Sequence, residues 1–319
     1  MPATGEINTV TGPVPASQLG IVLPHEHVRA TLWDRPAVAA VAYGGLFGEV
    51  LVTDEQRSAE VAAYRAAGGG TIVDVTPPGI GRSPELLRAI SVGTGVTIVM
   101  GCGWYREPYY PPEDLIDRRS VGALTDLLVA EIEDGVDGTG VRPGIIGEIG
   151  VNNSWISAQE ERVHRAAARA ARQTGLALTT HSSWSQVALA QLDIFDSEGL
   201  AADRVIIGHA CSYPDLRYYL AVLERGAYLE FDNIGQWDIP GYQDRVTDLI
   251  VELLHRGHAN RILLSHDVWN SRHFRFAGGT GFTHLLEAYL PELASRGVSQ
   301  AEIDQILIAN PAAALTPRP

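Results

Sequence analysis

Short apolar, β-branched runs alternate with helix-length stretches along most of this chain of 319 residues. Each run has the length of one strand, and the stretches between the runs have the periodicity of amphipathic helices. We count eight runs, which end near His25, Asp74, Gly101, Glu148, His181, His209, Asp232 and Asp267. Eight strand–helix units over about 250 residues are typical of a (β/α)8 or TIM barrel. No linker or change of composition divides the sequence, so the pattern predicts a single α/β domain over residues 1–319.

Helix signals stand between these runs. Thr53 with Gln56, and Ser157 with Glu160, have the spacing of capping boxes, in which each side chain bonds the other residue's backbone N–H. Gly175 follows the helical pattern that begins after Ser157, and glycine commonly ends a helix. These signals place helices between successive strands, as a barrel requires.

Composition excludes several classes of function. The net charge of -14 opposes binding to nucleic acid or to an anionic membrane. No apolar run approaches the roughly eighteen residues of a membrane span, and the first residues lack the pattern of a signal peptide, so we expect a cytoplasmic protein. The two cysteines, Cys102 and Cys211, are too few for a disulfide framework. All 24 basic side chains that are not histidine are arginine, so no lysine is present for catalysis or metal bridging.

The first strand ends in Pro24-His25-Glu26-His27. Side chains alternate along a strand, so His25 and His27 point to one side and Glu26 to the other. Two imidazoles that converge in this way suit a metal ion. An isolated pair of this kind is also compatible with two strand-end histidines that have no role.

Other strand ends carry further ligand-type side chains. In a barrel the carboxyl ends of the strands meet at one mouth, so residues distant in sequence become neighbours there. Imidazoles and carboxylates are ligands of divalent zinc, manganese and cobalt. Taken singly, each residue is compatible with a solvated strand end, but together the six are enough for two ions that share a bridging carboxylate. The predicted metal ligands are His25, His27, Glu148, His181, His209 and Asp267.

Sequence motifs over nearly the whole chain resemble a known family, the phosphotriesterase family of the amidohydrolase superfamily. The resemblance is strongest to the branch of phosphotriesterase homology proteins and phosphotriesterase-related proteins, and it implies an amidohydrolase-like TIM barrel with two metal ions. The motifs that carry it are TVTGPVPASQLGIVLPHEHV, GCGWYREPYYP, EDGVDGTGVRPGIIGEIG, LALTTHSS, RVIIGHAC, NRILLSHDVW, GGTGFTHLL and ANPAAAL.

The resemblance also implies a distribution of ligands between the two ions. His25, His27 and Asp267 would hold the more buried ion, and His181 and His209 the more exposed one. Many family members bridge the ions with a carbamylated lysine, which this chain cannot supply. Glu148, in GIIGEIG, is the matching position in the glutamate-bearing branch. Zn²⁺ is the expected metal, with Mn²⁺ and Co²⁺ as alternatives.

The chemistry of such a centre predicts a metal-activated hydroxide that attacks a carbonyl carbon. Asp267 would accept the proton and pass it to the leaving group. Tyr105 resembles the family's tyrosine beside the metals, where its hydroxyl would assist the oxyanion or position substrate, although a packed loop aromatic is equally compatible. Trp104 is expected to form part of the cavity wall, and His266 to lie on the outer face.

Two long segments, 33–50 and 274–282, lie on the strand-to-helix side, where barrels build their sites. Arg272, His273 and Arg275 follow Asp267 closely and are candidates for contact with substrate. Arginine binds carboxylate or phosphate through a planar fork, while exposed, solvated arginines are equally compatible with the sequence.

These observations predict a metal-dependent hydrolase of ester, lactone or amide bonds in a small molecule. The resemblance favours a lactonase, including one acting on sugar lactones or phosphorylated sugar lactones. The alternatives are an N-acyl amino acid or N-acyl taurine amidohydrolase or a carboxylesterase, with weak phosphotriesterase side activity. A catalytically silent barrel that binds a metal or ligand is the non-enzymatic alternative. Family resemblance also implies a homodimer.

Overall fold

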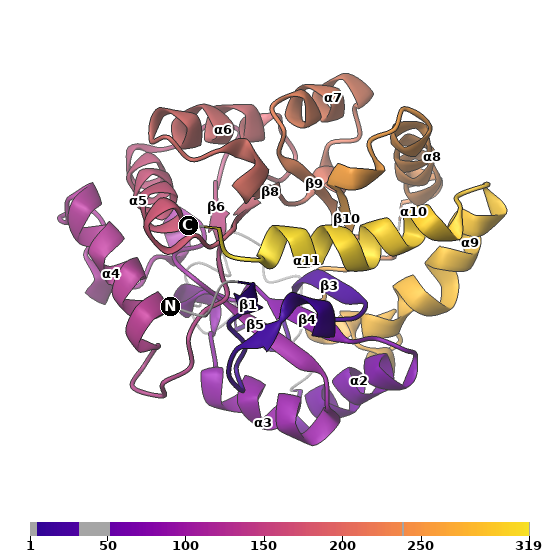
Figure 1. The fold of residues 1–319 in the computed structure, drawn as a ribbon, viewed down its shortest axis with the longest axis horizontal. Coiled ribbons are helices and arrows are strands. Elements are labelled where there is room, and N and C mark those ends of the chain that lie inside the picture. The colour runs from indigo at the N-terminus through magenta and orange to yellow at the C-terminus, as the bar shows by residue number, and fades with distance from the viewer. Residues whose placement is uncertain (1–4, 32–51, 238, 319) are drawn as a thin grey trace.

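The structure, a computed structural model, describes residues 5–31, 52–237 and 239–318. Eight parallel strands form one sheet in which each strand pairs with its neighbours in chain order (Figure 1). All eight predicted runs are strands, which confirms the predicted barrel, whereas the predicted loop 33–50 lies outside the described residues. The strands are β3 (Val22–Glu26), β4 (Thr71–Asp74), β5 (Thr97–Cys102), β6 (Ile145–Gly150), β7 (Leu178–His181), β8 (Val205–Ile207), β9 (Tyr228–Phe231) and β10 (Ile262–Leu264).

Helices surround the sheet, and each strand from β3 to β9 is followed by one (Figure 1). Both predicted capping boxes are present, at Thr53 and at Ser157, and Gly175 ends its helix with a φ of +76°. Within the described residues, no helix combines the length and apolar character needed to cross a bilayer. The seven helices are α2 (Asp54–Ala66), α3 (Pro84–Thr94), α4 (Val121–Asp134), α5 (Ala158–Thr174), α6 (Val187–Ser197), α7 (Leu216–Glu224) and α8 (Tyr242–His255).

After β10 the chain forms a loop and a series of shorter helical segments. They include α9 (Leu290–Ser295), α10 (Gln300–Asp304) and α11 (Asn310–Leu315), with wider, π-helical turns at Leu285–Tyr289 and Gln305–Ala309. A small hairpin of β1 (Glu6–Ile7) and β2 (Val14–Pro15) precedes the barrel. Ile7 from the hairpin and Leu315 from α11 belong to one buried cluster with the barrel interior, so both termini help to fill it.

Strand alternation divides the core into two layers. On β4, Ile72 packs in the large cluster shared with the helices, and Val73 packs in the smaller cluster inside the barrel. Ile98 and Val99 on β5 divide in the same way. Because both faces of a parallel barrel strand are buried, the strands are apolar runs without strict polar alternation. The ligand-type polar exceptions lie at or near the carboxyl ends of the strands, which is where the site forms.

The barrel closes between its first and last strands, β3 and β10. No strand ladder joins these two strands. Two backbone hydrogen bonds connect the segments just past them, from His27 N to Val268 O (3.1 Å) and from Asp267 N to His25 O (3.2 Å). We call this junction the seam. It matters for function because predicted ligands flank it on both sides.

Candidate metal centre and catalytic cavity

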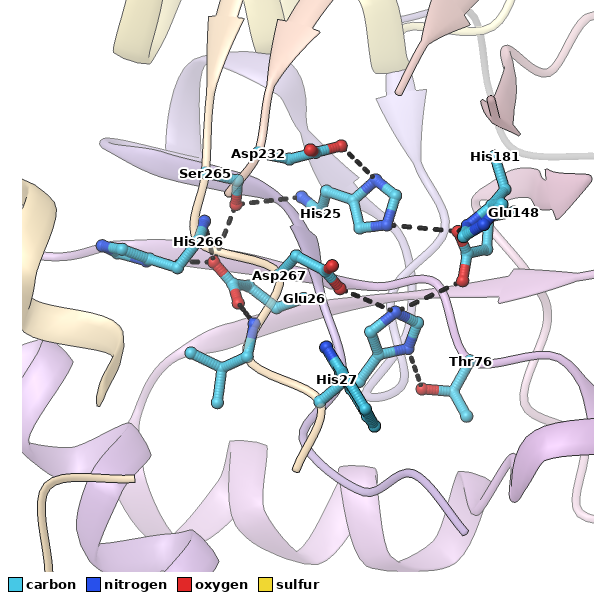
Figure 2. A network of polar contacts seen from close by, with 12 residues as sticks. His25, Glu26, His27, Thr76, Glu148, His181, Asp232, Ser265, His266 and Asp267 are labelled. Carbon is cyan, nitrogen blue, oxygen red and sulfur yellow. Dashed lines mark hydrogen bonds and ion pairs between the residues drawn. The ribbon is translucent and has the colours of Figure 1, made fainter. Parts of the chain in front are cut away.

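Glu148, on β6, lies at the centre of a cluster of ligand-type side chains at the carboxyl ends of the strands (Figure 2). Its Oε2 is 3.0 Å from His181 Nδ1 and 3.4 Å from both His25 Nε2 and His209 Nε2. Its Oε1 is 3.4 Å from His27 Nε2. All five side chains are buried. The structure therefore brings four predicted imidazole ligands, from the ends of three strands, around the carboxylate of Glu148.

Asp267 joins the cluster from the other side of the seam. Its Oδ1 lies 3.4 Å from His27 Nε2, and its Oδ2 accepts a hydrogen bond from Asn233 Nδ2 at 2.9 Å. Asp267 and His209 have φ angles of +55° and +59°, in a region that non-glycine residues rarely adopt and that is enriched at functional sites. The backbone is thus strained at two of the residues that carry ligand-type side chains.

Carboxylates behind the cluster orient two of the imidazoles. Asp232 lies 3.0 Å from His209 Nδ1 and 3.1 Å from His25 Nδ1, and it also accepts the backbone N–H of His209 at 2.8 Å. Glu230 lies 3.0 Å from His25 Nδ1. A carboxylate at Nδ1 leaves Nε2 free to face the centre and fixes the ring, as in many metal sites.

A threonine takes this role for His27. Thr76 Oγ1 lies 2.9 Å from His27 Nδ1. Asp74, at the end of β4, accepts hydrogen bonds from the backbone N–H groups of Thr76 (3.1 Å) and Val28 (2.7 Å). It therefore fixes the backbone at Thr76 and at the residue that follows His27. The Nε2 atom of His27 therefore points toward Glu148 and Asp267.

The arrangement fits divalent metal ions. His25 Nε2 is buried and has no hydrogen-bond partner among the described residues. His181 Nδ1 and His209 Nε2 lie only 2.6 Å apart, so two nitrogen atoms with lone pairs converge on one place. Three overlapping sets of donor atoms lie within 4.8 Å of one another: His25, His27 and Glu148; His25, His209 and Asp232; and Glu148, His181 and His209. Nitrogen and oxygen donors in this mixture suit zinc, manganese or cobalt.

Charge within the cluster also suits metal binding. Burial opposes ionisation of Glu148, but the imidazoles around it, His181 foremost, hold the pKa of this carboxyl well below its usual range. Burial, followed by the charge of His209, lowers the pKa of His181 to about 3. Burial alone would lower the pKa of the other imidazoles, but nearby carboxylates outweigh it: Asp267 and Glu148 raise the pKa of His27 to about 9, and Asp232 raises that of His209 to about 10. The carboxylates thus make the site attract positive charge, and metal binding would displace protons from these imidazoles.

The cluster forms the floor of a cavity of about 790 Å³. Outside the predicted ligands, the fully charged residues among the described lining residues are Arg106 and Arg272. The guanidinium of Arg106 lies 4.7 Å from the centre of the Tyr105 ring, in cation–π contact. The cavity therefore combines a cation-binding floor with walls that carry positive charge, which favours an anionic substrate group.

The catalytic candidate Tyr105 and two of the four candidate substrate residues, Arg272 and His273, line this cavity. The hydroxyl of Tyr105 lies 3.5 Å from His181 Nε2, with the two rings edge to face. Asn270 Nδ2 donates a hydrogen bond to His273 Nε2 at 2.9 Å, which fixes the direction of this ring. These residues are placed to contact a substrate at the centre.

The structure does not bring Trp104 or Arg275 to the cavity. Trp104 is buried in the core layer under the helices, and its indole N–H donates to Asp114 Oδ2 at 2.6 Å. Arg275 turns toward Thr283, whose Oγ1 lies 3.5 Å from its Nη1. In each case a polar partner outside the cavity determines the direction of the side chain.

Glu26 is a site residue that the sequence reasoning did not identify. Its buried carboxylate spans the seam, where it accepts hydrogen bonds from Ser265 Oγ (2.7 Å), His266 N (2.9 Å) and Val268 N (2.8 Å) (Figure 2). His266 Nδ1 lies 3.1 Å from the same carboxylate, and the other ring nitrogen accepts the backbone N–H of Leu285 at 2.8 Å. His266 thus lies away from the metal cluster, as expected from alternation.

Glu230, Asp74 and Thr76 were also missed as supporting residues. Glu230 had a usable signal, because it lies two residues before Asp232 on the same face of β9 and is charged at a buried strand position. A buried acid in a strand requires a partner. The partners themselves come from distant strands, so only the closed barrel reveals them.

Comparison with known proteins identifies the family. The model of the phosphotriesterase family matches residues 5–315. The chain belongs to the phosphotriesterase family. It is 35% identical to a phosphotriesterase homology protein of Escherichia coli over 75% of this chain and 81% of that protein. It is 31% identical to the N-acetyltaurine hydrolase of Danio rerio over 98% of both chains.

Solved structures of the phosphotriesterase family share the fold. The crystal structure of the Escherichia coli phosphotriesterase homology protein, with phosphate in its active site, has a TM-score of 0.85 at 31% identity and covers 93% of this chain and 99% of its own. A lactonase from Listeria monocytogenes has a TM-score of 0.87 at 25% identity and covers 98% of this chain and 100% of its own. The chain is therefore a hydrolase of the phosphotriesterase family, a family that depends on two metal ions.

Proposed function

We propose that the protein hydrolyses the acyl C–N or C–O bond of a small anionic substrate with the help of two divalent metal ions. The observation that carries this proposal is the combination of the ligand cluster around Glu148 with the guanidinium groups of Arg106 and Arg272 in one cavity. The cluster provides for activation of a carbonyl group, and the arginines provide for recognition of an anion.

His25, His27 and Asp267 would hold one ion and His181 and His209 the other, with Glu148 between them. When bound, such ions polarise a carbonyl oxygen and lower the pKa of water. Zn²⁺ is the proposed metal, with Mn²⁺ and Co²⁺ as alternatives, because the donors combine nitrogen and oxygen.

Asp267 is the proposed catalytic base. Asn233 donates to Oδ2 of Asp267 at 2.9 Å, which leaves Oδ1 directed toward His27 and the centre. Oδ1 would take a proton from the attacking water and return it to the departing nitrogen or oxygen. The hydroxyl of Tyr105, on the opposite side of His181 from Glu148, would donate to the substrate carbonyl oxygen as negative charge develops there.

Within this class we place N-acyl amides of a small sulfonic or carboxylic acid first. The relatives that match 98% of both chains are N-acetyltaurine hydrolases, and a sulfonate suits the two arginines. This order reverses the expectation from sequence, which placed lactones first. Lactones, including sugar lactones and their phosphates, are the second candidate, favoured by the structural likeness to a lactonase. Phosphotriester hydrolysis is proposed only as a weak side activity.

A substrate panel on metal-reconstituted protein tests the proposal. It pairs N-acetyltaurine with its neutral analogue N-ethylacetamide, and a carboxylated or phosphorylated lactone with its neutral parent. We expect kcat/KM to be at least about tenfold higher for the anionic member of the productive pair, as one good charge-assisted contact provides. Two bound ions without hydrolysis of any carbonyl substrate would contradict the proposal and favour a silent metal-binding barrel.

The predicted cytoplasmic location and the predicted homodimer stay proposals. Light scattering coupled to size-exclusion chromatography tests the second, with a mass near twice 34.4 kDa as the expected result.

A further inference from the structure

A second groove adjoins the catalytic cavity at the mouth of the barrel. It has a volume of about 790 Å³ and lies over α5 and α6, which are neighbours on the outside of the barrel (Figure 1). Trp184, which follows β7, lines both the groove and the catalytic cavity. This indole is therefore the boundary between the two spaces, only three residues from the predicted ligand His181.

The position of Trp184 is specified by the fold. Its φ is +59°, a conformation that is a marked outlier for a bulky residue. Ser212 Oγ accepts the backbone N–H of Trp184 at 2.8 Å and itself donates to His209 O at 2.7 Å. The indole packs edge to face on Trp237 with ring centres 5.1 Å apart, yet 61% of the residue is exposed. Strain retained beside a catalytic site is a mark of function rather than of stability.

The groove has an apolar stretch between polar side chains, which include Ser154, Ser185 and Gln186. Trp155, which is 60% exposed, faces it together with Ile156 and, from α6, Val187 and Ile194. The two acids in its lining are already paired: Glu161 with Arg165 at 2.7 Å, and Asp193 with Arg225 at 2.8 Å.

Exposed apolar residues elsewhere are arranged differently. Leu115, which is 41% exposed, lines a separate hollow of about 480 Å³ that Trp155 also borders, but none of the described residues that line this hollow also lines the catalytic cavity. Val92 and Ile308 are also exposed, but neither lines the catalytic cavity or either of these two hollows, and single apolar residues on a surface need no function. The two indoles differ because they line one groove that meets the catalytic cavity at Trp184. An occupant that lies in both spaces would bury them.

We propose that this groove binds the apolar acyl chain of the substrate, so that the enzyme prefers acyl groups longer than acetyl. The inference rests on the proposed hydrolysis of an acyl bond at the metal centre. The anionic end would lie toward Arg272, whose loop follows β10, three strands round the barrel from β7. The reacting carbonyl would lie at the centre, and the chain would pass Trp184 toward Trp155.

Two variants test the groove without disturbing the centre. Trp155→Ala removes an exposed wall, and Ala190→Glu places an unpaired charge on the exposed surface of α6 that lines the groove. The matched control is Ile308→Ala, which truncates an exposed apolar side chain elsewhere. Folding of each variant is checked by its thermal midpoint.

The first measurement is calorimetric binding of acetate, hexanoate and decanoate to the metal-loaded protein, which requires no turnover. Wild type should bind decanoate at least tenfold more tightly than acetate. Trp155→Ala should lose about tenfold of that preference, as expected for about 60 Å² of lost indole contact, and Ala190→Glu should lose about as much because an apolar chain would desolvate the new charge. Ile308→Ala should keep the full preference. A wild-type affinity that does not depend on chain length, or a preference that survives in both groove variants, would overturn the proposal.

The second measurement compares kcat/KM for N-decanoyltaurine with that for N-acetyltaurine. The ratio should fall about tenfold in each groove variant. If no amide or lactone is hydrolysed but the chain-length preference in binding depends on Trp155, the groove stands and the proposed reaction fails. If hydrolysis occurs with a ratio unaffected by both variants, the reaction stands and the groove assignment fails.

Discussion

Glu26→Gln is expected to weaken both the barrel and its metal site, although it changes no shape. The carboxylate of Glu26 is fully buried and accepts hydrogen bonds from Ser265 and from the backbone of His266 and Val268 across the seam. An amide can present only one oxygen to these donors. Its NH₂ group must then face a further donor, which in the present arrangement is the N–H of Val268, 2.8 Å from Oε2.

The magnitude follows from those contacts. A hydrogen bond to a charged group contributes about 1.5 to 3 kcal/mol, and a buried N–H left without an acceptor costs about 1 to 3 kcal/mol. One bond lost and one donor unsatisfied together give a loss of about 2.5 to 6 kcal/mol in the free energy of unfolding. Because His25, His27 and Asp267 flank the same seam, we also expect weaker retention of metal.

Urea unfolding of the metal-free protein measures the first effect, and competition with a chelator measures the second. Glu252→Gln is the matched control, because Glu252 lies on the surface of α8 with 42% of its side chain exposed and forms an i,i+4 pair with Arg256. The control should change stability by less than about 0.5 kcal/mol. A Glu26→Gln variant as stable as this control, with unchanged metal affinity, would refute the role assigned to the seam.

Three further changes have defined outcomes. Burial lowers the pKa of His164 from 6.5 to about 4. Between these two pH values the unfolded chain binds more protons than the folded protein, so the free energy of unfolding should fall by up to about 3 kcal/mol as the pH is lowered through this window. In a series of unfolding midpoints measured against pH, His164→Leu should flatten this part of the curve. Asp232→Asn removes the carboxylate shared by His25 and His209 and should lower metal affinity about 10- to 100-fold in chelator competition; unchanged affinity would contradict its orienting role. Arg272→Gln should raise KM about tenfold for the anionic member of the substrate pair and much less for the neutral one, and equal effects on both would argue against anion recognition.

Strand periodicity and strand ends were enough to predict the fold. Each strand of a parallel barrel is a local apolar run, and the rule that consecutive parallel strands connect in a right-handed sense leaves one simple order. The pair His25 and His27 followed from alternation alone. Convergence of Glu148, His181, His209 and Asp267 followed from the barrel, because all the strand ends meet at one mouth.

Contacts across the seam and in the loops could not be predicted from the sequence. Glu26 contacts residues about 240 positions later in the chain, and such a contact leaves no local pattern. Trp104 turns into the core because Asp114 offers its indole N–H an acceptor, which a motif does not reveal. The left-handed backbone of Trp184 likewise depends on Ser212 in the next loop.

The metal content of the wild-type protein and of Glu148→Gln tests the central claim most directly. Both proteins would be stripped, reloaded with Zn²⁺, dialysed and analysed for ions per chain alongside hydrolysis of the best substrate. The account predicts two ions per wild-type chain, and in Glu148→Gln a loss of at least one ion together with most of the activity. An active wild-type protein with a single ion, or a Glu148→Gln variant that keeps both ions and the full rate, would contradict a glutamate-bridged pair of metals.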